Sequence, residues 1–459
     1  MNLGNDSDLI SDRKRGSKPM ATQLNRENIG IVKNPVFRTY AENYLDVYDD
    51  FVSQVDQFGL PFAPTREKEL QEERNLLRSY QVTERNNGAS LVKGTICGAC
   101  DACRTGIDSY TGIISLMCHR NCFFCFNPNQ ENYEGYSQTK KDWASELRQV
   151  HRRQPHLRYV ALTGGEPLLH RDEMLEYFRM AKELWPEASL RLYTSGDLLD
   201  EETSSALADA GLEEIRFSLK LEDTPEEREK VYQAMVLAKH RIPRVMVEMP
   251  VLPDKEEEMK EILERLESMR IFGINLLELC FPYHNAEAFR SRGYRLRYPP
   301  YRTLYNFWYA GGLPIDGSEL LALRLLRYAA DKKMQMTVHY CSLENKHFGQ
   351  VYMQNLGASN NEACFVMSPR DFYLKTVKAF GKDISKAERI FRAHQRSDYS
   401  IDREKGFIQF SPDCAKLLKK TDMELGISYN IREYRDGENV IRELRLDLEQ
   451  AADFRTEEL

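Results

Sequence analysis

The sequence has no apolar run that approaches the roughly 18 residues of a membrane-spanning helix, so a membrane protein is not expected. Its first residues are polar, which argues against a signal peptide and favours a cytoplasmic protein. The chain also lacks a basic excess, since its formal net charge is −7 and its pI is about 5.9. Because nucleic-acid-binding surfaces are usually basic, this balance disfavours a nucleic acid as partner.

Cysteine is scarce, with 10 residues in a chain of 459, which is too few for a disulfide scaffold. Most of these cysteines lie in two tight groups, and such clustering favours metal binding over disulfide bridges. The 42% hydrophobic and 29% charged residues are typical of a globular protein. A chain of this length is expected to form about two or three domains.

Strands and helices alternate through the middle of the chain, which predicts βαβ units and a parallel sheet. An apolar run at 112–117 forms the first expected strand and ends at Cys118. The other strands are expected at 159–163, 189–194, 215–219, 244–249 and 274–280, separated by helices at 139–153, 171–184, 200–210, 225–240 and 255–272. Six such units predict an α/β fold, a partial (βα)6 TIM-like barrel that binds ligands at the carboxyl ends of its strands.

Composition divides the chain into further segments around this barrel. The C-terminal part predicts helices at about 385–396 and 412–423 and two strands that flank an Asp-Gly turn. We therefore expect a disordered tail (1–20), a helical N-terminal region (21–88), a cysteine-rich loop (89–110), the barrel with its cap (111–350) and a small C-terminal α+β domain (351–459).

Cys118, Cys122 and Cys125 form a C-x3-C-x2-C run directly after the first expected strand. Three thiolates on one loop can hold three corners of a [4Fe–4S] cluster and leave its fourth iron open to a ligand. The alternative is a structural zinc site, but zinc usually takes four ligands from pairs of C-x2-C spacing. Phe124, inside the loop, suits an apolar wall for a planar ring.

The next expected strand ends in Gly164-Gly165-Glu166-Pro167. Glycines here allow the backbone to approach a ligand closely, although the same residues could form a simple turn. Taken together with the C-x3-C-x2-C run, this segment resembles the radical S-adenosylmethionine (SAM) superfamily. Further segments at 191–194, 210–217, 248–253, 275–278, 292–294 and 339–341 resemble an uncharacterised group related to pyruvate formate-lyase activating enzymes.

The resemblance covers roughly 90–350 and implies both a cofactor and a reaction. It implies that Cys118, Cys122 and Cys125 bind a [4Fe–4S] cluster, and that the Gly164–Pro167 backbone and Glu166 hold the amino group of SAM. A reductase such as flavodoxin or ferredoxin would supply one electron. SAM would then be cleaved to methionine and a 5′-deoxyadenosyl radical that abstracts hydrogen from a substrate. The helical N-terminal region and the C-terminal domain depart from the family, and no SPASM extension is evident.

Other strand ends carry residues that could complete the SAM site. Ser195, Ser218 and Glu248 follow or end expected strands, so they could bind the ribose or carboxylate of SAM or merely cap the strands. Arg216 could pair with the carboxylate of SAM or with a neighbouring Glu. Asn275 and Glu278 are expected to face the reaction chamber.

Cys97, Cys100 and Cys103 form a second group, with C-x2-C-x2-C spacing, upstream of the first. They predict a second iron–sulfur cluster, with zinc or a structural role as alternatives. Cys341 is the first candidate for a fourth ligand, and His339 and Cys364 are competitors.

The resemblance also favours one class of substrate. The relation to activating enzymes favours a peptide or protein, either activated to a glycyl radical or modified on a side chain. Small-molecule or cofactor biosynthesis and RNA modification are the alternatives within the superfamily. A non-enzymatic zinc protein is the alternative from a different class. A tyrosine-rich segment at 283–309 is expected to act as a lid.

Overall fold

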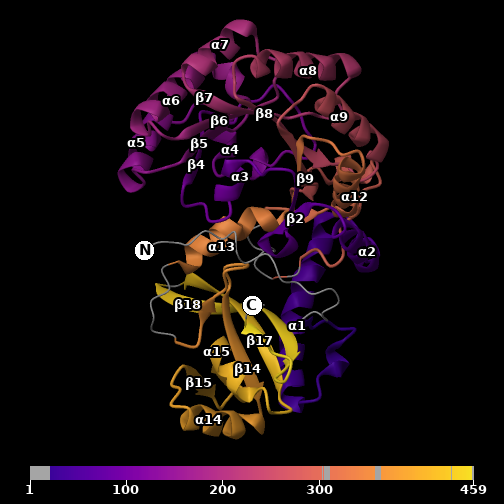
Figure 1. Ribbon diagram of the computed structural model, residues 1–459, viewed down its shortest axis with the longest axis vertical. Coiled ribbons are helices and arrows are strands. Elements are labelled where there is room, and N and C mark those ends of the chain that lie inside the picture. The colour runs from indigo at the N-terminus through magenta and orange to yellow at the C-terminus, as the bar shows by residue number, and fades with distance from the viewer. Residues whose placement is uncertain (1–20, 302, 304–310, 357–362, 436, 457–458) are drawn as a thin grey trace. The chain divides into compact units, whose positions relative to one another are not determined.

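A computed structural model describes residues 21–301, 303, 311–356, 363–435, 437–456 and 459 (Figure 1). The expected disordered tail and residues 302 and 304–309 of the expected lid lie outside the described residues. The chain divides into two compact units. The larger holds 49–357 and 370–372, and the smaller holds the remaining residues. Helix α1 (Pro35–Val55) crosses the division.

The larger unit is built on a nine-stranded sheet in the order β2-β3-β12-β9-β8-β7-β6-β5-β4. Strands β4 to β9 and β12 run parallel to one another, whereas β3 is antiparallel to β12 and to β2. This mostly parallel sheet confirms the predicted fold class. The strands are β2 (Val82–Arg85), β3 (Ser90–Lys93), β4 (Ser109–Ile113), β5 (Tyr159–Thr163), β6 (Ser189–Thr194), β7 (Leu212–Phe217), β8 (Arg244–Val251), β9 (Gly273–Glu278) and β12 (Thr337–Cys341).

Helices connect the parallel strands, and polar caps fix several of their first residues. Thr224 and Glu227 form a reciprocal capping box at the start of α8, and Asp200 caps α7 through the backbone N–H of Thr203. The helices of this layer are α5 (Trp143–Arg153), α6 (Arg171–Leu184), α7 (Glu201–Asp209), α8 (Pro225–Lys239), α9 (Glu256–Ser268) and α12 (Ser318–Asp331).

Shorter elements of the larger unit connect or flank this layer. They are α2 (Glu67–Leu77), α3 (Gly98–Ala102), α4 (Tyr133–Tyr136), α10 (Ala286–Arg290), α13 (Phe348–Asn355), β10 (Cys280–Phe281) and β11 (Leu313–Pro314). Among the described residues, no helix is long and apolar enough to cross a membrane.

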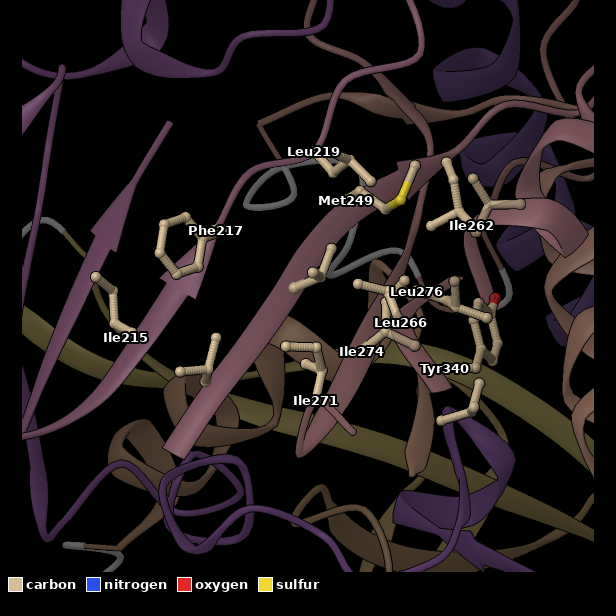
Figure 2. Close-up of a cluster of buried hydrophobic side chains, with 14 of the residues drawn as sticks. Ile215, Phe217, Leu219, Met249, Ile262, Leu266, Ile271, Ile274, Leu276 and Tyr340 are labelled. Atoms are coloured by element: carbon tan, nitrogen blue, oxygen red, sulfur yellow. The ribbon is translucent and has the colours of Figure 1, made fainter. Parts of the chain in front are cut away.

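The core of the larger unit lies between the strands and the helices. Figure 2 shows Ile274 and Leu276 of β9 beside Ile262 and Leu266 of α9, all four of which are buried. Successive residues of a strand point to opposite faces of the sheet. The residue between the two β9 side chains, Asn275, therefore faces the other side of the sheet, which is the interior of the partial barrel.

Two segments differ from the sequence-based expectation. The segment 88–110 was expected to be a loop, but it contains β3 and helix α3. The first barrel strand was expected to reach Met117, but β4 ends at Ile113. Ile114 and Leu116 are buried as their hydrophobicity requires, yet their backbones pair with the loop at 136–141 instead of a strand, through Leu116 N–Tyr136 O at 2.7 Å and Lys141 N–Ile114 O at 2.7 Å.

The smaller unit contains a separate antiparallel sheet in the order β1-β18-β17-β14-β16-β15, with β13 paired to β14. The strands are β1 (Thr22–Gln23), β13 (Val366–Met367), β14 (Leu374–Phe380), β15 (Tyr399–Asp402), β16 (Phe407–Phe410), β17 (Glu424–Arg435) and β18 (Glu438–Gln450), with helices α14 (Asp383–Ala393) and α15 (Pro412–Ala415). The helix expected at 412–423 is shorter, because the chain passes from α15 into a single 3-10 turn that ends at Leu418.

Candidate functional site

The cysteine loop follows β4 at the carboxyl end of the parallel strands. Burial raises the pKa of all three thiols, that of Cys122 to about 11, and Cys122 also feels the charges of Cys118 and Cys125. The loop therefore brings the three sulfurs near one another. Within the described part of the chain, however, no three Cys, His, Asp or Glu side chains already stand in the geometry of a metal site.

The Gly164–Pro167 segment is packed directly against the entry to this loop. The backbone N–H of Gly165 donates to Ser115 O (3.1 Å), and that of Glu166 donates to Met117 O (2.7 Å). A Cβ on Gly165 would stand 1.7 Å from Met117 O, and one on Gly164 would stand 2.5 Å from Ser115 O. Gly164 also has φ +123°, which side chains disfavour. Only glycines therefore allow the two loops this approach.

The Glu166 carboxylate fastens this loop to the end of β6. It is 2% exposed and accepts four hydrogen bonds. Oε1 accepts from Leu168 N (3.0 Å) and Thr194 Oγ1 (2.6 Å), and Oε2 accepts from the backbone N and the Oγ of Ser195 (both 2.6 Å). A carboxylate has about four acceptor positions. The side chains of Glu166 and Ser195 thus bind each other.

The residues between Cys118 and Cys122 are held by carboxylates. Asp197 lies 2.7 Å from His119 Nε2 and 3.3 Å from Arg120 Nη1, and Arg120 also pairs with Asp223. These partners follow β6 and β7, so the ends of two strands support the cysteine loop.

Three further residues predicted for this site lie around the same end of the sheet. Phe124 is half-buried and packs edge-on against Phe123, with ring centroids 5.0 Å apart. Pro167 is buried and begins a 3-10 turn. Ser218 directly follows β7, and within the described residues its hydroxyl has no hydrogen-bond partner.

The upstream cysteines lie elsewhere, against the inner face of the barrel. Cys97 caps α3 and Cys100 and Cys103 follow at helical spacing, so all three share one side of that helix. Cys97 is 3% exposed, packs against Met246 of β8 and donates to Glu214 Oε2 (2.8 Å). The hydrogen bond from Cys97, together with Arg216, holds the pKa of Cys100 well below its ordinary value.

Arg216 faces this second group of cysteines. It is 3% exposed, and its guanidinium pairs with Glu214 (2.7 Å) and Glu248 (2.8 Å). Of the two partners considered for Arg216 in the sequence, the structure places neighbouring glutamates beside it. Glu248 lies in the middle of β8, not at its end as the sequence suggested, because β8 continues to Val251.

The candidates for a fourth upstream ligand lie on β12. His339 Nδ1 contacts Asn275 Oδ1 (3.0 Å) and its Nε2 contacts Ser90 Oγ (2.8 Å), so both ring nitrogens are occupied. Cys341 accepts from Asn345 Nδ2 (3.1 Å) and feels the charges of Cys103 and Cys100. Cys364 belongs to the smaller unit.

The family model described as "Radical SAM superfamily" matches residues 113–266, which run from the end of β4 to α9. This segment of the chain is therefore a radical SAM domain. This confirms the family predicted from the two motifs.

Similar proteins match this chain over part of their length. A protein of Methanocaldococcus jannaschii, provisionally named a glycyl-radical enzyme activating enzyme, is 26% identical over 50% of this chain and 58% of its own. The structure "Native anSMEcpe with bound AdoMet and Cp18Cys peptide" is 21% identical over 38% of this chain and 51% of that one, with a TM-score of 0.30. Streptococcus suis SuiB bound to SAM is 15% identical over 39% and 43%, with a TM-score of 0.32. The chain thus spans about half the length of the proteins that it matches.

One charged residue beside the cysteine loop was missed in the sequence. Lys220 is 8% exposed and lies two residues beyond Ser218, and its charge acts on Cys118, Cys122 and Cys125. Its ammonium group has no hydrogen bond or ion pair with another described residue. A buried cation is costly without a partner. Its position after a β-strand at the ligand end of the sheet was the signal that could have identified it.

Proposed function

We propose that this chain is a radical SAM enzyme that binds a [4Fe–4S] cluster on Cys118, Cys122 and Cys125. The observation that carries the proposal is the close packing of the Gly164–Pro167 loop on the cysteine loop through Gly165 N–Ser115 O and Glu166 N–Met117 O. This contact brings the Gly164–Pro167 backbone next to the loop that carries the three thiols. Three thiols and no fourth cysteine on the loop are the donor set that leaves one iron free.

The surrounding residues fit the groups of SAM. Lys220 is an unpaired buried cation beside the three thiols, which suits the carboxylate of SAM. The backbone of Gly164 and Gly165 suits its amino group, because the Glu166 carboxylate is already occupied by four donors. Ser218 offers a free hydroxyl to the ribose, and Phe124 offers an apolar wall to the adenine.

With cluster and SAM bound, the site would supply reductive cleavage of SAM to methionine and a 5′-deoxyadenosyl radical, which abstracts hydrogen from a substrate. The chain's own residues would orient SAM and exclude water. Asp197 and Asp223 would keep His119 and Arg120, and with them the cysteine loop, in one position. A reductase of the flavodoxin or ferredoxin type would deliver the electron.

The substrate that we propose is a peptide or protein, either activated to a glycyl radical or modified on a side chain. The support is the name of the Methanocaldococcus jannaschii relative, which assigns it to the activation of glycyl-radical enzymes. Glycyl-radical activation takes place on a protein backbone.

A second iron–sulfur cluster on Cys97, Cys100 and Cys103 completes the proposal. Its support is the helical spacing of the three sulfurs along one side of α3, and the electrostatic proximity of Cys341 to Cys100 and Cys103. Cys341 is the fourth ligand that we propose.

Iron, acid-labile sulfide and zinc, measured per chain after anaerobic reconstitution, test these assignments. We expect about eight irons in the unaltered protein and about four after Cys118, Cys122 and Cys125 are all replaced by Ala. Cys280→Ala, which removes a buried cysteine outside both groups, is the matched control and should keep all eight. Stoichiometric zinc without iron would refute the radical SAM activity.

A further inference from the structure

Arg216 is the centre of a buried polar array on the inner wall of the barrel. Its five N–H groups have distinct partners. Nε donates to Glu214 Oε1 (2.7 Å), and Nη1 donates to Glu248 Oε2 (2.8 Å) and lies 3.5 Å from Tyr193 OH. Nη2 donates to the sulfurs of Cys97 (3.3 Å) and Cys100 (3.2 Å). No donor of Arg216 is left for another ligand.

Asn275 adds a further donor to the same sulfur. Its Nδ2 lies 3.5 Å from Cys100 Sγ and 3.0 Å from Glu248 Oε2, while its Oδ1 contacts His339. Because Asn275 lies on β9 and Arg216 on β7, donors reach the cysteines of α3 from two separate strands. The array holds one side of the cysteine helix in a fixed place.

We propose that Arg216 is the positioning residue of the upstream cysteine site, and that its N–H···S bonds raise the reduction potential of an iron–sulfur cluster held there. The inference rests on the second cluster assigned under Proposed function. Hydrogen bonds and positive charge at cysteinate sulfurs stabilise the reduced cluster, which carries one more negative charge. The same reasoning applies to Asn275, which contributes one neutral donor.

The geometry requires arginine in particular. The planar guanidinium directs Nε and Nη1 to the two carboxylates and Nη2 to the two sulfurs. A single ammonium group cannot reach all four partners at the same time. A lysine at 216 would keep the positive charge on the inner wall but lose the paired N–H···S contacts. Arg216→Lys therefore separates the hydrogen bonds from the charge.

The test is a redox titration of the anaerobically reconstituted protein, followed by electron paramagnetic resonance. SAM perturbs the signal of the cluster with an open iron, so the two clusters are told apart by adding SAM. We expect Arg216→Lys to reduce the reduced-to-oxidised ratio of the upstream cluster about tenfold at a fixed potential, which is a shift of about 59 mV to lower potential for one electron. The Cys118 cluster should keep its midpoint.

Two variants keep the result interpretable. Arg244→Lys is the matched control, because Arg244 also lies 3.3 Å from Glu214 but donates to neither cysteine, and its midpoint should equal that of the unaltered protein. Asn275→Leu removes one neutral donor and should lower the midpoint potential of the upstream cluster by a smaller amount, which tests the proposal even if Arg216→Lys does not fold.

An unchanged upstream midpoint in the variants that fold, or an equal shift of both clusters, would overturn the inference. The iron count of the unaltered protein separately tests the proposed function: about four irons would refute the second cluster itself.

Discussion

Glu166→Gln changes the side chain that connects the Gly164–Pro167 loop to β6. Its effect on the free energy of unfolding follows from four hydrogen bonds. The amide keeps one oxygen, so its NH₂ group must face one of two donor pairs, Leu168 N with Thr194 Oγ1 or Ser195 N with Ser195 Oγ. A hydroxyl can turn to accept from the amide, but a backbone N–H cannot. Either orientation of the amide therefore leaves one buried backbone N–H without an acceptor.

An unsatisfied buried donor costs about 1–3 kcal/mol, and the loss of charge weakens the remaining bonds by about 1 kcal/mol. We therefore expect Glu166→Gln to lower the free energy of unfolding of the larger unit by about 3 kcal/mol. Trp143 and Trp185 belong to the larger unit, and the smaller unit contains no tryptophan, so fluorescence during urea denaturation of the metal-free protein reports on the larger unit.

Glu222→Gln is the matched control, because Glu222 lies in the same region and burial raises the pKa of its carboxyl, yet it accepts no side-chain hydrogen bond among the described residues. Glu222→Gln should lower the free energy of unfolding by no more than about 0.5 kcal/mol. A double-mutant cycle of Glu166→Gln with Ser195→Ala should give a coupling energy of about 1 kcal/mol or more. A Glu166→Gln protein as stable as the Glu222→Gln protein would refute the claim that the four hydrogen bonds of Glu166 stabilise the contact between this loop and β6.

Three other changes follow from single features of the larger unit. Lys220→Met should weaken SAM binding to the reconstituted protein at least about tenfold, because it removes a salt bridge to a desolvated carboxylate. Lys220→Arg should restore most of the affinity, because it restores the positive charge. Equal affinities of the three proteins in an equilibrium binding assay would contradict the assignment of Lys220 to the SAM carboxylate. Burial lowers the pKa of His170, whose Nε2 contacts Ser115 Oγ at 2.7 Å. The unfolded chain then binds the proton more readily, so stability should fall as the pH decreases below about 6.5, and urea midpoints of His170→Asn should show a smaller slope over that window. Thr224→Ala removes the capping box of α8 and should cost about 1 kcal/mol in the same denaturation assay, with Thr421→Ala in the smaller unit leaving the tryptophan transition unchanged.

Much of the larger unit could be predicted because local signals and tertiary packing agree there. The strand at Tyr159–Thr163 and the helix at Arg171–Leu184 have the predicted bounds, since alternation, apolar period and flanking polar residues mark the same positions. The run at 114–117 could not be assigned correctly from its sequence. Its residues are as apolar as a strand, but a neighbouring loop takes their hydrogen bonds, and hydrophobicity does not distinguish the two partners.

In the candidate site, the sequence predicted which residues take part but not the direction of every side chain. The motifs identified the cysteine loop and its glycine-rich neighbour, because cysteine spacing and paired glycines are local properties of the chain. The direction of Arg216 depended on a segment more than a hundred residues upstream, whose helix α3 carries Cys97 and Cys100 to the inner wall. Ile215 and Phe217 pack outward in the core, so Arg216 must face inward, and inside the barrel the nearest acceptors are these sulfurs and two glutamates. The ammonium of Lys220, beyond the end of β7, has no hydrogen bond or ion pair among the described residues, which makes it and not Arg216 the cation that a carboxylate at the cysteine loop would meet.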